Sequence, residues 1–220
     1  IEEFGGVYDD TQVTGYVASI GGRLVANSEM PNLQFTFTVL NSPVVNAFAL
    51  PGGYVYVTRG LVALANSEAE LAGVLAHELG HVTARHTAQR YNRAIATSMG
   101  ATILDAWVGG GATSQLIGLG AQLYLASYSR AQETEADVLG IRYLRRTGYD
   151  PYAEADFLRS LQRHSQLLKR IYAPDSRERA LDQFFMTHPQ TSDRVVNVIQ
   201  QAGGFPDGET GRRLRDPFLD

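Results

Sequence analysis

The chain has 220 residues, of which 44% are hydrophobic and 19% are charged, a balance typical of a folded globular protein rather than a disordered one. Its formal net charge of −4 argues against a nucleic-acid-binding protein and against charge-driven binding to an anionic membrane. Cysteine is absent, which excludes a disulfide framework, a cysteine-ligated metal centre and a cysteine nucleophile.

The N-terminal part of the chain predicts one helix followed by a small sheet. Apolar residues recur every three or four positions over 10–27, which is the period of an amphipathic helix. Alternating Phe and Thr predict a strand over 33–40, and two further strands are predicted over 44–50 and 54–57, on either side of a Pro-Gly-Gly turn. We expect these strands to form an antiparallel or mixed sheet.

The rest of the chain is predicted to be helical. Ser67 and Glu70 have the spacing of a capping box and precede an apolar stripe that extends to Val82, so a helix is expected to begin there. The other predicted helices cover about 116–146, 151–168, 175–185 and 191–202, and the tail at 203–220 is expected to pack loosely. The whole chain, 1–220, is therefore predicted to be one mostly helical α+β domain with a small sheet near its N-terminus.

One stretch has to be tested against a membrane span. Residues 106–129 carry no charge and are numerous enough to cross a bilayer, but three consecutive glycines at 109–111 and several polar residues interrupt them. We expect a buried or interfacial helical hairpin here and no stable membrane span. The glycine break at 109–111 is a candidate hinge for a mobile lid.

The segment His77-Glu78-Leu79-Gly80-His81 carries the clearest chemical signal. Residues four apart on a helix share a face, so His77 and His81 can bind one ion together, and imidazole is a preferred zinc ligand. Glu78 lies about 100° round the helix from His77, beside the ion but not bound to it. Gly80 allows another backbone or a substrate to come close. The pattern matches the metalloprotease motif in which the glutamate is the general base.

A catalytic zinc needs a third protein ligand, and three places can supply it. His86 lies about 140° off the shared face and is expected at the surface or behind the ligands. The second place is the later predicted helix, which offers Glu133 and Glu135. Glu133 shares a face with Asp137, so Glu133 can bind while Asp137 accepts a hydrogen bond from a ligand imidazole, which leaves Glu135 solvated or in a salt bridge. His188 is the third.

Four separated segments resemble the HtpX/BepA/Oma-type gluzincin metallopeptidases, which are relatives of the CAAX prenyl proteases. The segments are Asn46-Ala47-Phe48-Ala49-Leu50-Pro51-Gly52-Gly53, the His77–His81 motif, Ser129-Arg130 with Glu133-x-x-Ala136-Asp137, and His188-Pro189 with Arg194. The resemblance covers roughly 40–200. It implies a zincin-like fold, one zinc per chain held by His77, His81 and Glu133, and Glu78 as the base that activates a metal-bound water. The family's membrane helices and helical-repeat extension are not present in this sequence, which implies a soluble single-domain member.

The resemblance also implies roles for the remaining residues. Arg194 is expected to donate to the developing oxyanion. His188 either stabilises the transition state, or binds zinc as a fourth ligand and keeps the enzyme latent, or is only a turn residue before proline. The substrate, an unfolded or extended polypeptide, is expected to add a strand along Asn46, Ala47, Phe48 and Ala49, or along 54–57.

The sequence thus predicts a zinc-dependent endopeptidase with a role in protein quality control. The alternatives are a latent or inactive chaperone-like module that binds metal, a hydrolase of non-peptide amides, and a structural protein with a chance motif. The chain begins with Ile1, and we expect that a signal peptide was removed and that the protein lies in the cell envelope, in the periplasm. The sequence predicts no oligomeric state.

Overall fold

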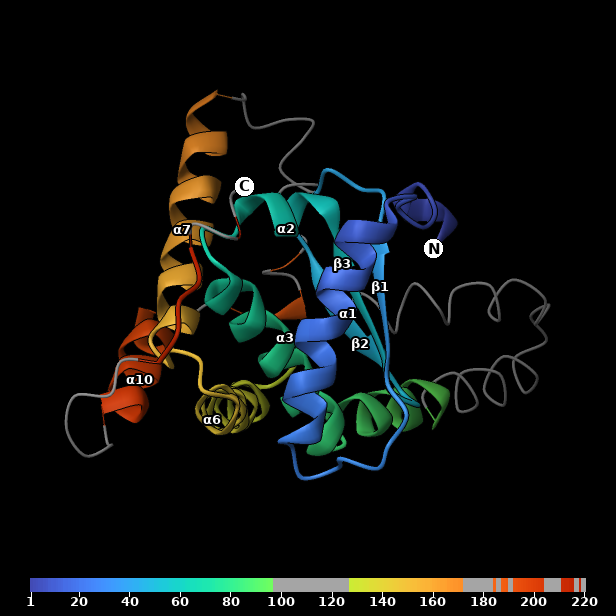
Figure 1. The fold of residues 1–220 in the computed structure, drawn as a ribbon. Helices are drawn as coiled ribbons and strands as arrows, with labels where there is room; N and C mark the ends of the chain where they lie inside the picture. The colour runs from blue at the N-terminus through green and yellow to red at the C-terminus, as the bar shows by residue number, and fades with distance from the viewer. Residues whose placement is uncertain are drawn as a thin grey trace, which may run out of the picture.

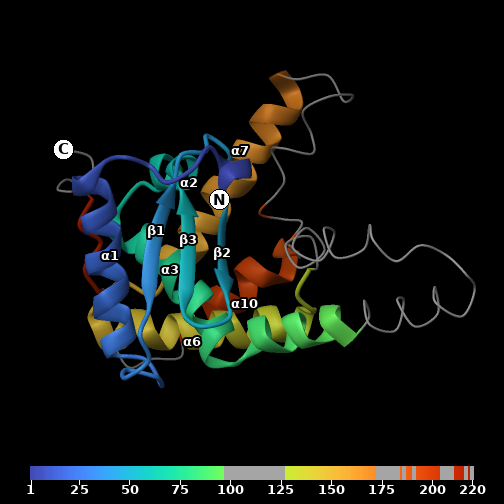
Figure 2. The ribbon, with the colours of Figure 1, turned by 90° about the vertical axis from the view of Figure 1, so that its right-hand side faces the viewer.

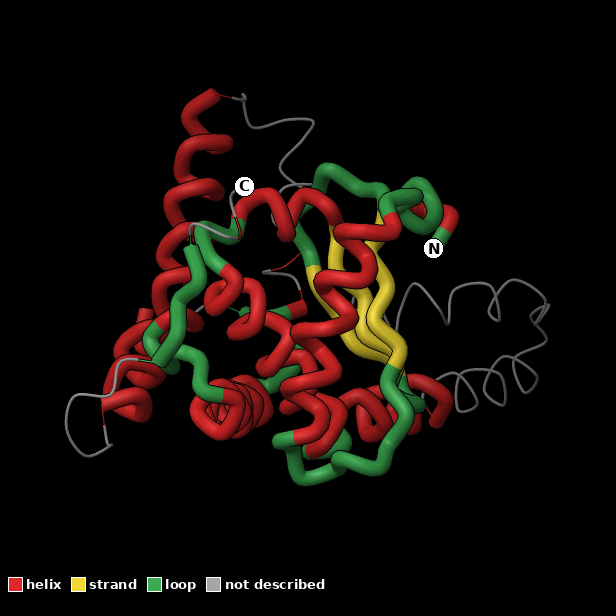
Figure 3. The backbone as a smooth tube through the Cα atoms, viewed as in Figure 1, coloured by secondary structure: helices red, strands yellow, loops and turns green. Residues whose placement is uncertain are grey.

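The computed structural model describes residues 1–96, 127–171, 184, 187–189, 192–203, 211–215 and 218. Within them the chain is mostly helical with one small sheet, which confirms the predicted α+β class (Figure 3). The helices are η1 (Glu2–Phe4), α1 (Thr11–Ala26), α2 (Arg59–Leu64), α3 (Glu68–Thr83), α6 (Arg130–Thr147), α7 (Ala153–Ile171) and α10 (Ser192–Gly203), and residues 86–96 are also helical. The strands are β1 (Thr36–Leu40), β2 (Ala47–Leu50) and β3 (Tyr54–Thr58).

The sheet is mixed and has the order β1-β3-β2 (Figure 2). β1 runs parallel to β3, and β2 runs antiparallel to β3. Gly52 and Gly53 have φ angles of 95° and 86°, a region that favours glycine, and they make the tight turn between β2 and β3. Among the described residues β2 is therefore an edge strand of the sheet, whereas β3 is paired on both sides.

Helix α3 lies at the centre of the molecule and contacts α1, α6, α7 and strand β2 (Figure 1). Every residue from Glu68 to Val82 is buried. The sequence predicted one apolar stripe on this helix, but other elements enclose it on all sides. Its polar residues are therefore buried along with its apolar ones, and each of them needs a partner within the protein.

Helix α6 starts later than the sequence predicted. A continuous helix from about 116 is wrong, because residues 127–129 are not helical. Ser129 begins α6 with a complete capping box, in which its side chain accepts from the backbone amide of Gln132 and the side chain of Gln132 accepts from the backbone amide of Ser129. Most of the uncharged stretch 106–129, the glycine hinge at 109–111 and most of the predicted helix 175–185 lie outside the described residues. No helix in the described part of the chain has the length and hydrophobicity needed to cross a bilayer.

Part of the tail is held more tightly than we expected. Arg212 forms a β-bridge with Tyr149, and the carbonyl oxygens of Arg213 and Leu214 accept from the backbone amides of Ala69 and Glu68. The first amides of a helix have no partner within it, so the tail supplies acceptors that α3 needs. Residues 211–215 consequently belong to the packed domain.

Glycines set the close approach of α6 to α3. A Cβ atom on Gly80 would lie 2.8 Å from the carbonyl oxygen of Ala136, and one on Gly140 would lie 3.2 Å from the backbone nitrogen of His77. The sequence prediction that Gly80 admits another backbone is confirmed. The contact brings the first turns of α6 beside the second half of α3.

We expect Gly80→Ala to destabilise the protein by about 1–3 kcal/mol, because two backbones must separate and this outweighs the higher helix propensity of alanine. Gly22→Ala on α1 is the matched control. A Cβ atom there meets nothing within 4 Å, so this change should be neutral or stabilising by up to about 1 kcal/mol. Urea unfolding of the two variants measures the difference. Equal stability of both variants would contradict the packing argument.

Candidate metal centre

The first two donor side chains of the site come from α3. Ser67 caps this helix by accepting from the backbone amide of Glu70, as the sequence predicted. The four-residue spacing places His77 and His81 on the same face, and their Nε2 atoms lie 3.1 Å apart. Both imidazoles are buried. Burial lowers the pKa of His81 well below its usual value, which keeps the ring neutral, the form that binds a metal.

The third donor comes from the first turn of α6. Oε1 of Glu133 lies 3.3 Å from Nε2 of His81, and Oε2 lies 3.6 Å from Nε2 of His77. Burial opposes ionisation of Glu133, but the neighbouring charges of His188 and Arg194 hold its pKa well below the usual value. Glu133 is therefore a carboxylate at neutral pH, directed at the histidine pair.

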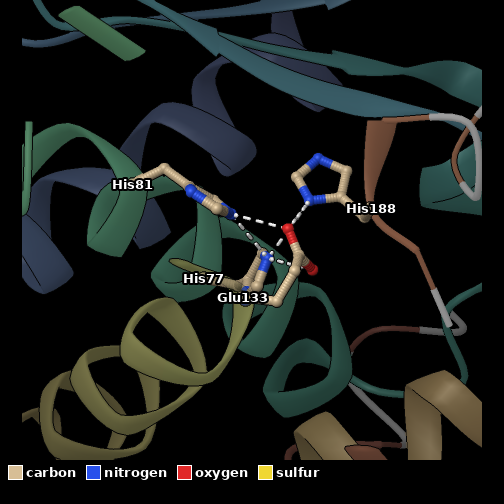
Figure 4. A group of neighbouring side chains, drawn as sticks. All are labelled: His77, His81, Glu133 and His188. Carbon is tan, nitrogen blue, oxygen red and sulfur yellow. Dashed lines mark hydrogen bonds and ion pairs between the residues drawn. The ribbon is translucent and has the colours of Figure 1, made fainter. Parts of the chain in front are cut away.

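His188 closes the group from the opposite side (Figure 4). Its Nδ1 lies 3.3 Å from Nε2 of His77 and 3.1 Å from Oε1 of Glu133. The residue is fully buried, and burial disfavours its charged form, but the carboxylates of Glu78 and Glu133 outweigh this and raise the pKa of His188. His188 lies in a bend before proline, but the alternative that it is only a turn residue does not account for its burial and its contacts with the donors.

The four side chains fit one divalent cation. One potential ligand atom from each of His77, His81, Glu133 and His188 lies within 4.8 Å of the others, and all four residues are buried. Three imidazole nitrogens and a carboxylate oxygen at such short distances leave no room for a substrate group between them, but they form the nitrogen and oxygen donor set that zinc prefers. The site is thus built for a small cation.

Glu78 lies beside the donors without joining them. It is fully buried, and its Oε1 is 3.2 Å from Nε2 of His188. Apart from this contact, its carboxylate has no hydrogen-bond partner in the described part of the chain. A carboxylate held in this way can accept a proton from a molecule bound next to it.

Asp137 and Arg194 support the donors from behind. Oδ1 of Asp137 is 2.8 Å from Nδ1 of His77, the arrangement predicted from the shared face of Glu133 and Asp137. Arg194 donates through Nε and Nη2 to Asp137, and its Nη1 lies 2.6 Å from Oε2 of Glu133. Because the buried guanidinium is already engaged by two carboxylates, its position favours orienting the donors over the expected role as an oxyanion donor.

His86 lies behind the donors, although the angular argument for it does not apply. That argument assumed a continuous helix, but α3 ends at Thr83 and Arg85 adopts a φ of 62°, which turns the chain back. Nδ1 of His86 therefore lies 3.1 Å from Nδ1 of His81. Its Nε2 contacts the exposed carboxylate of Glu135 at 3.2 Å, so Glu135 is in a salt bridge as expected and is not part of the donor group.

Sequence reasoning did not identify Glu154 or Tyr128. Oε1 of Glu154, from the first turn of α7, lies 3.7 Å from Nδ1 of His77. Burial and the charge of Asp137 raise the pKa of Glu154 well above its usual value. The ring of Tyr128 stacks on that of His81, with centroids 3.7 Å apart. An acidic residue in the first turn of a helix is normally a surface feature, so only the burial of α7 against α3 reveals Glu154.

The predicted substrate strand lies at an edge of the sheet, as far as the described strands show. Asn46, Ala47, Phe48 and Ala49 are all buried, and β2 pairs only with β3 among the described strands. The alternative docking edge at 54–57 is wrong, because β3 is the central strand and both of its edges are occupied.

Comparison with known proteins agrees with this geometry. The sequence profile of peptidase family M48 matches residues 11–202. The chain belongs to this family. The resemblance drawn from four separate motifs is thereby confirmed. Peptidases of the M48 family depend on a metal, and the buried, histidine-rich group of His77, His81, Glu133 and His188 is where such a metal would be held in this chain.

Two kinds of M48 relative stand out. The β-barrel assembly-enhancing protease of Yersinia pestis is 32% identical over 203 residues, which are 88% of this chain and 40% of the relative. The mitochondrial metalloendopeptidase OMA1 of Schizosaccharomyces pombe is 31% identical over 209 residues, which are 93% of this chain and 57% of the relative. The chain thus covers the shared domain and only about half of these proteins.

We expect Asp137→Asn to lower the free energy of unfolding by about 3 kcal/mol, because it leaves Arg194 buried with less compensating charge. Burial alone would raise the pKa of Asp137, but Arg194 and His77 lower it overall. The stabilisation from the ionised form is therefore complete above the ordinary aspartate pKa, near 4, and is lost as the pH falls toward the lower folded value. Urea unfolding between pH 7 and pH 3, with a chelator present, measures this dependence.

Asp156→Asn is the control for Asp137→Asn. Asp156 pairs with the partly exposed Arg159 and Arg213, so its loss should change the free energy of unfolding by less than about 1 kcal/mol. If the free energy of unfolding falls with decreasing pH as steeply in Asp137→Asn as in the wild type, Asp137 does not carry the effect.

Proposed function

We propose that this M48 chain is the catalytic domain of a zinc-dependent endopeptidase that hydrolyses peptide bonds in unfolded or extended polypeptides. The observation that carries the proposal is the convergence of His77, His81 and Glu133, with Glu78 beside them and outside the donor group. One zinc per chain is held by His77, His81 and Glu133. When bound, zinc supplies Lewis-acid chemistry, lowering the pKa of a water molecule and polarising a carbonyl group.

The protein's own residues carry the proton transfers and the positioning. Glu78 accepts a proton from the attacking water and later returns it to the leaving amine. Asp137 fixes the orientation of the His77 ring through Nδ1, and Arg194 holds both Asp137 and Glu133 in place. Because the site is buried, these charges act in a medium of low dielectric, where electrostatic interactions are stronger than in water.

We further propose that the protein rests in a latent form. A catalytic zinc site keeps one coordination position open for substrate or water. His188 places Nδ1 among the donors and Nε2 against Glu78, so a single side chain covers both the open position and the base. This geometry favours the role of His188 as a fourth ligand over a role in the transition state. Release of His188 is then the activating step.

We propose a location in the cell envelope, in the periplasm, and a role in protein quality control. The support is the similarity to proteases named for enhancing β-barrel assembly, since closed β-barrels with lipid-facing surfaces are characteristic of outer membranes. The relative named as mitochondrial shows that the domain also works elsewhere. Fractionation of a bacterium that expresses the protein tests the location. The protein should appear in the same fraction as a periplasmic marker.

Three variants test the catalytic and latent roles together. We expect Glu78→Gln to lower casein cleavage about 10²- to 10⁴-fold with its zinc content unchanged, because only the base is lost. We expect His188→Ala to cleave casein faster than the wild type. Glu135→Gln, which alters an exposed carboxylate outside the donor group, should behave as the wild type. Zinc is measured by elemental analysis of protein purified without chelators.

The contrary outcomes separate the rival functions. Zinc retained in every variant without cleavage by any would identify a metal-binding module. Slower cleavage by His188→Ala would assign His188 to the transition state. Absence of zinc from the wild type would remove the proposal.

The edge of β2 that faces away from β3 is the proposed docking site for the substrate strand. The backbone amide of Thr58 donates to the carbonyl of Asn46, so the alternation of an antiparallel pair turns the amides of Ala47 and Ala49 away from β3. Because Ala47 and Ala49 are buried, an added strand would pair with these amides only after displacing what covers them.

Ala49→Pro removes one outward amide and leaves the pairing with β3 intact. We expect the KM for a cleaved peptide to rise by up to about tenfold, the effect of one lost hydrogen bond, with kcat little changed. Ala49→Gly disturbs the same position but keeps the amide, so its KM should stay near that of the wild type. Matching KM values for the two variants would argue for another docking edge.

A further inference from the structure

Tyr128 carries a buried hydroxyl group that nothing in the described part of the chain satisfies. Only 3% of the residue is exposed, and its phenolic oxygen has no hydrogen-bond partner among the described residues. Buried hydroxyl groups are normally paired, because removing them from water without a partner is costly. We therefore expect an unpaired hydroxyl group beside a proposed reaction centre to find its hydrogen-bond partner in a molecule that binds there.

The ring of Tyr128 is held on both faces. His81 stacks on one face with ring centroids 3.7 Å apart and planes inclined by 19°, so the guanidinium of Arg90, 4.3 Å from the ring centroid, lies over the other face. The backbone amide of Tyr128 donates to the carbonyl of Thr187 at 3.1 Å, and the ring of His188 is 5.3 Å away. These contacts fix the ring beside two of the donor side chains, His81 and His188.

The ring of Tyr128 lies beside the proposed donors, with its centroid 3.7 Å from that of His81 and 5.3 Å from that of His188, so its buried hydroxyl belongs to the same interior region. A neutral tyrosine can donate a hydrogen bond. Peptide hydrolysis develops negative charge on the carbonyl oxygen, and the expected donor for that charge, Arg194, is engaged elsewhere.

We propose that Tyr128 is a catalytic residue whose hydroxyl donates a hydrogen bond to the carbonyl oxygen of the scissile peptide bond as that oxygen becomes negative. The proposal rests on the proposed peptidase function. The hydroxyl keeps its proton throughout, so no bond to Tyr128 forms or breaks. A donor fixed in advance by stacking needs no reorganisation when the charge appears.

Tyr128→Phe tests this role, because it removes the oxygen and keeps the stacked ring. Tyr91→Phe, which removes the hydroxyl of a 40% exposed tyrosine in the neighbouring helical segment 86–96, is the matched control. Both changes are made in the wild type and in His188→Ala, so that latency does not hide the effect. We expect kcat for a casein-derived peptide to fall about 100-fold in Tyr128→Phe, with KM within threefold of its parent.

Two further measurements do not depend on turnover. Calorimetry should show that the affinity for a phosphinic peptide, built on a casein cleavage site mapped by mass spectrometry, falls about as much as kcat, since this group resembles the tetrahedral transition state. The zinc content and melting temperature of Tyr128→Phe should equal or exceed those of its parent, because the free protein loses no hydrogen bond. Tyr91→Phe should change none of these quantities.

The proposal is overturned if kcat and phosphinic-peptide affinity stay within threefold of the parent values. It is also overturned if the melting temperature drops by several degrees, which would reveal a structural partner for the hydroxyl. Failure of the peptidase function looks different: the wild type, His188→Ala and Tyr91→Phe would all bind zinc without cleaving casein, and both proposals would then fall together.

Discussion

Two helices have to cross almost in backbone contact for this site to exist. A carboxylate on α6 can reach the imidazoles of α3 only because Gly80 presents no side chain to Ala136, and because Gly140 in turn admits the backbone of His77. The distances from Glu133 to the two imidazoles depend on this crossing. The two glycines lower the helix propensity of α3 and α6, which is the cost of the close approach.

A second constraint is electrostatic. Because α3 is enclosed on all sides, the charges of the site cannot be screened by water. The carboxylates of the site are Glu78, Glu133 and Asp137, and Arg194 contacts Glu133 and Asp137 directly. The raised pKa of Glu154 favours its uncharged form, so it adds little to their charge. A bound divalent cation would reduce this excess of negative charge, so metal binding and stability of the domain are expected to be linked.

The motif residues could be predicted from sequence because they depend on local rules. The four-residue spacing of His77 and His81, the shared face of Glu133 and Asp137, and the capping pattern at Ser67 follow from helix geometry alone. Where the chain leaves a helix, the same rules fail. The angular argument for His86 assumed helical backbone at Arg85, where φ is positive, and the long predicted helix continued through residues 127–129, which are not helical.

Other features depend on tertiary packing and gave no signal in the sequence. Glu154 has the appearance of an ordinary charged residue in the first turn of α7, and Tyr128 that of one more apolar residue in an uncharged stretch. The strand order could not be predicted either, because the hydrophobic pattern does not indicate that the last of the three strands lies between the first two. That order is what leaves β2, rather than β3, at the edge.

The hydrogen bonds from Glu68 and Ala69 to the carbonyl groups of Leu214 and Arg213 have a consequence for biosynthesis. The helix that bears the histidine motif is translated well before the residues that complete its first turn. Until those residues emerge from the ribosome, two amides of that turn have only water or transient acceptors. Maturation of the site is therefore expected to finish after translation of the domain, and a nick near residue 210 would loosen the helix from the end opposite to the metal donors.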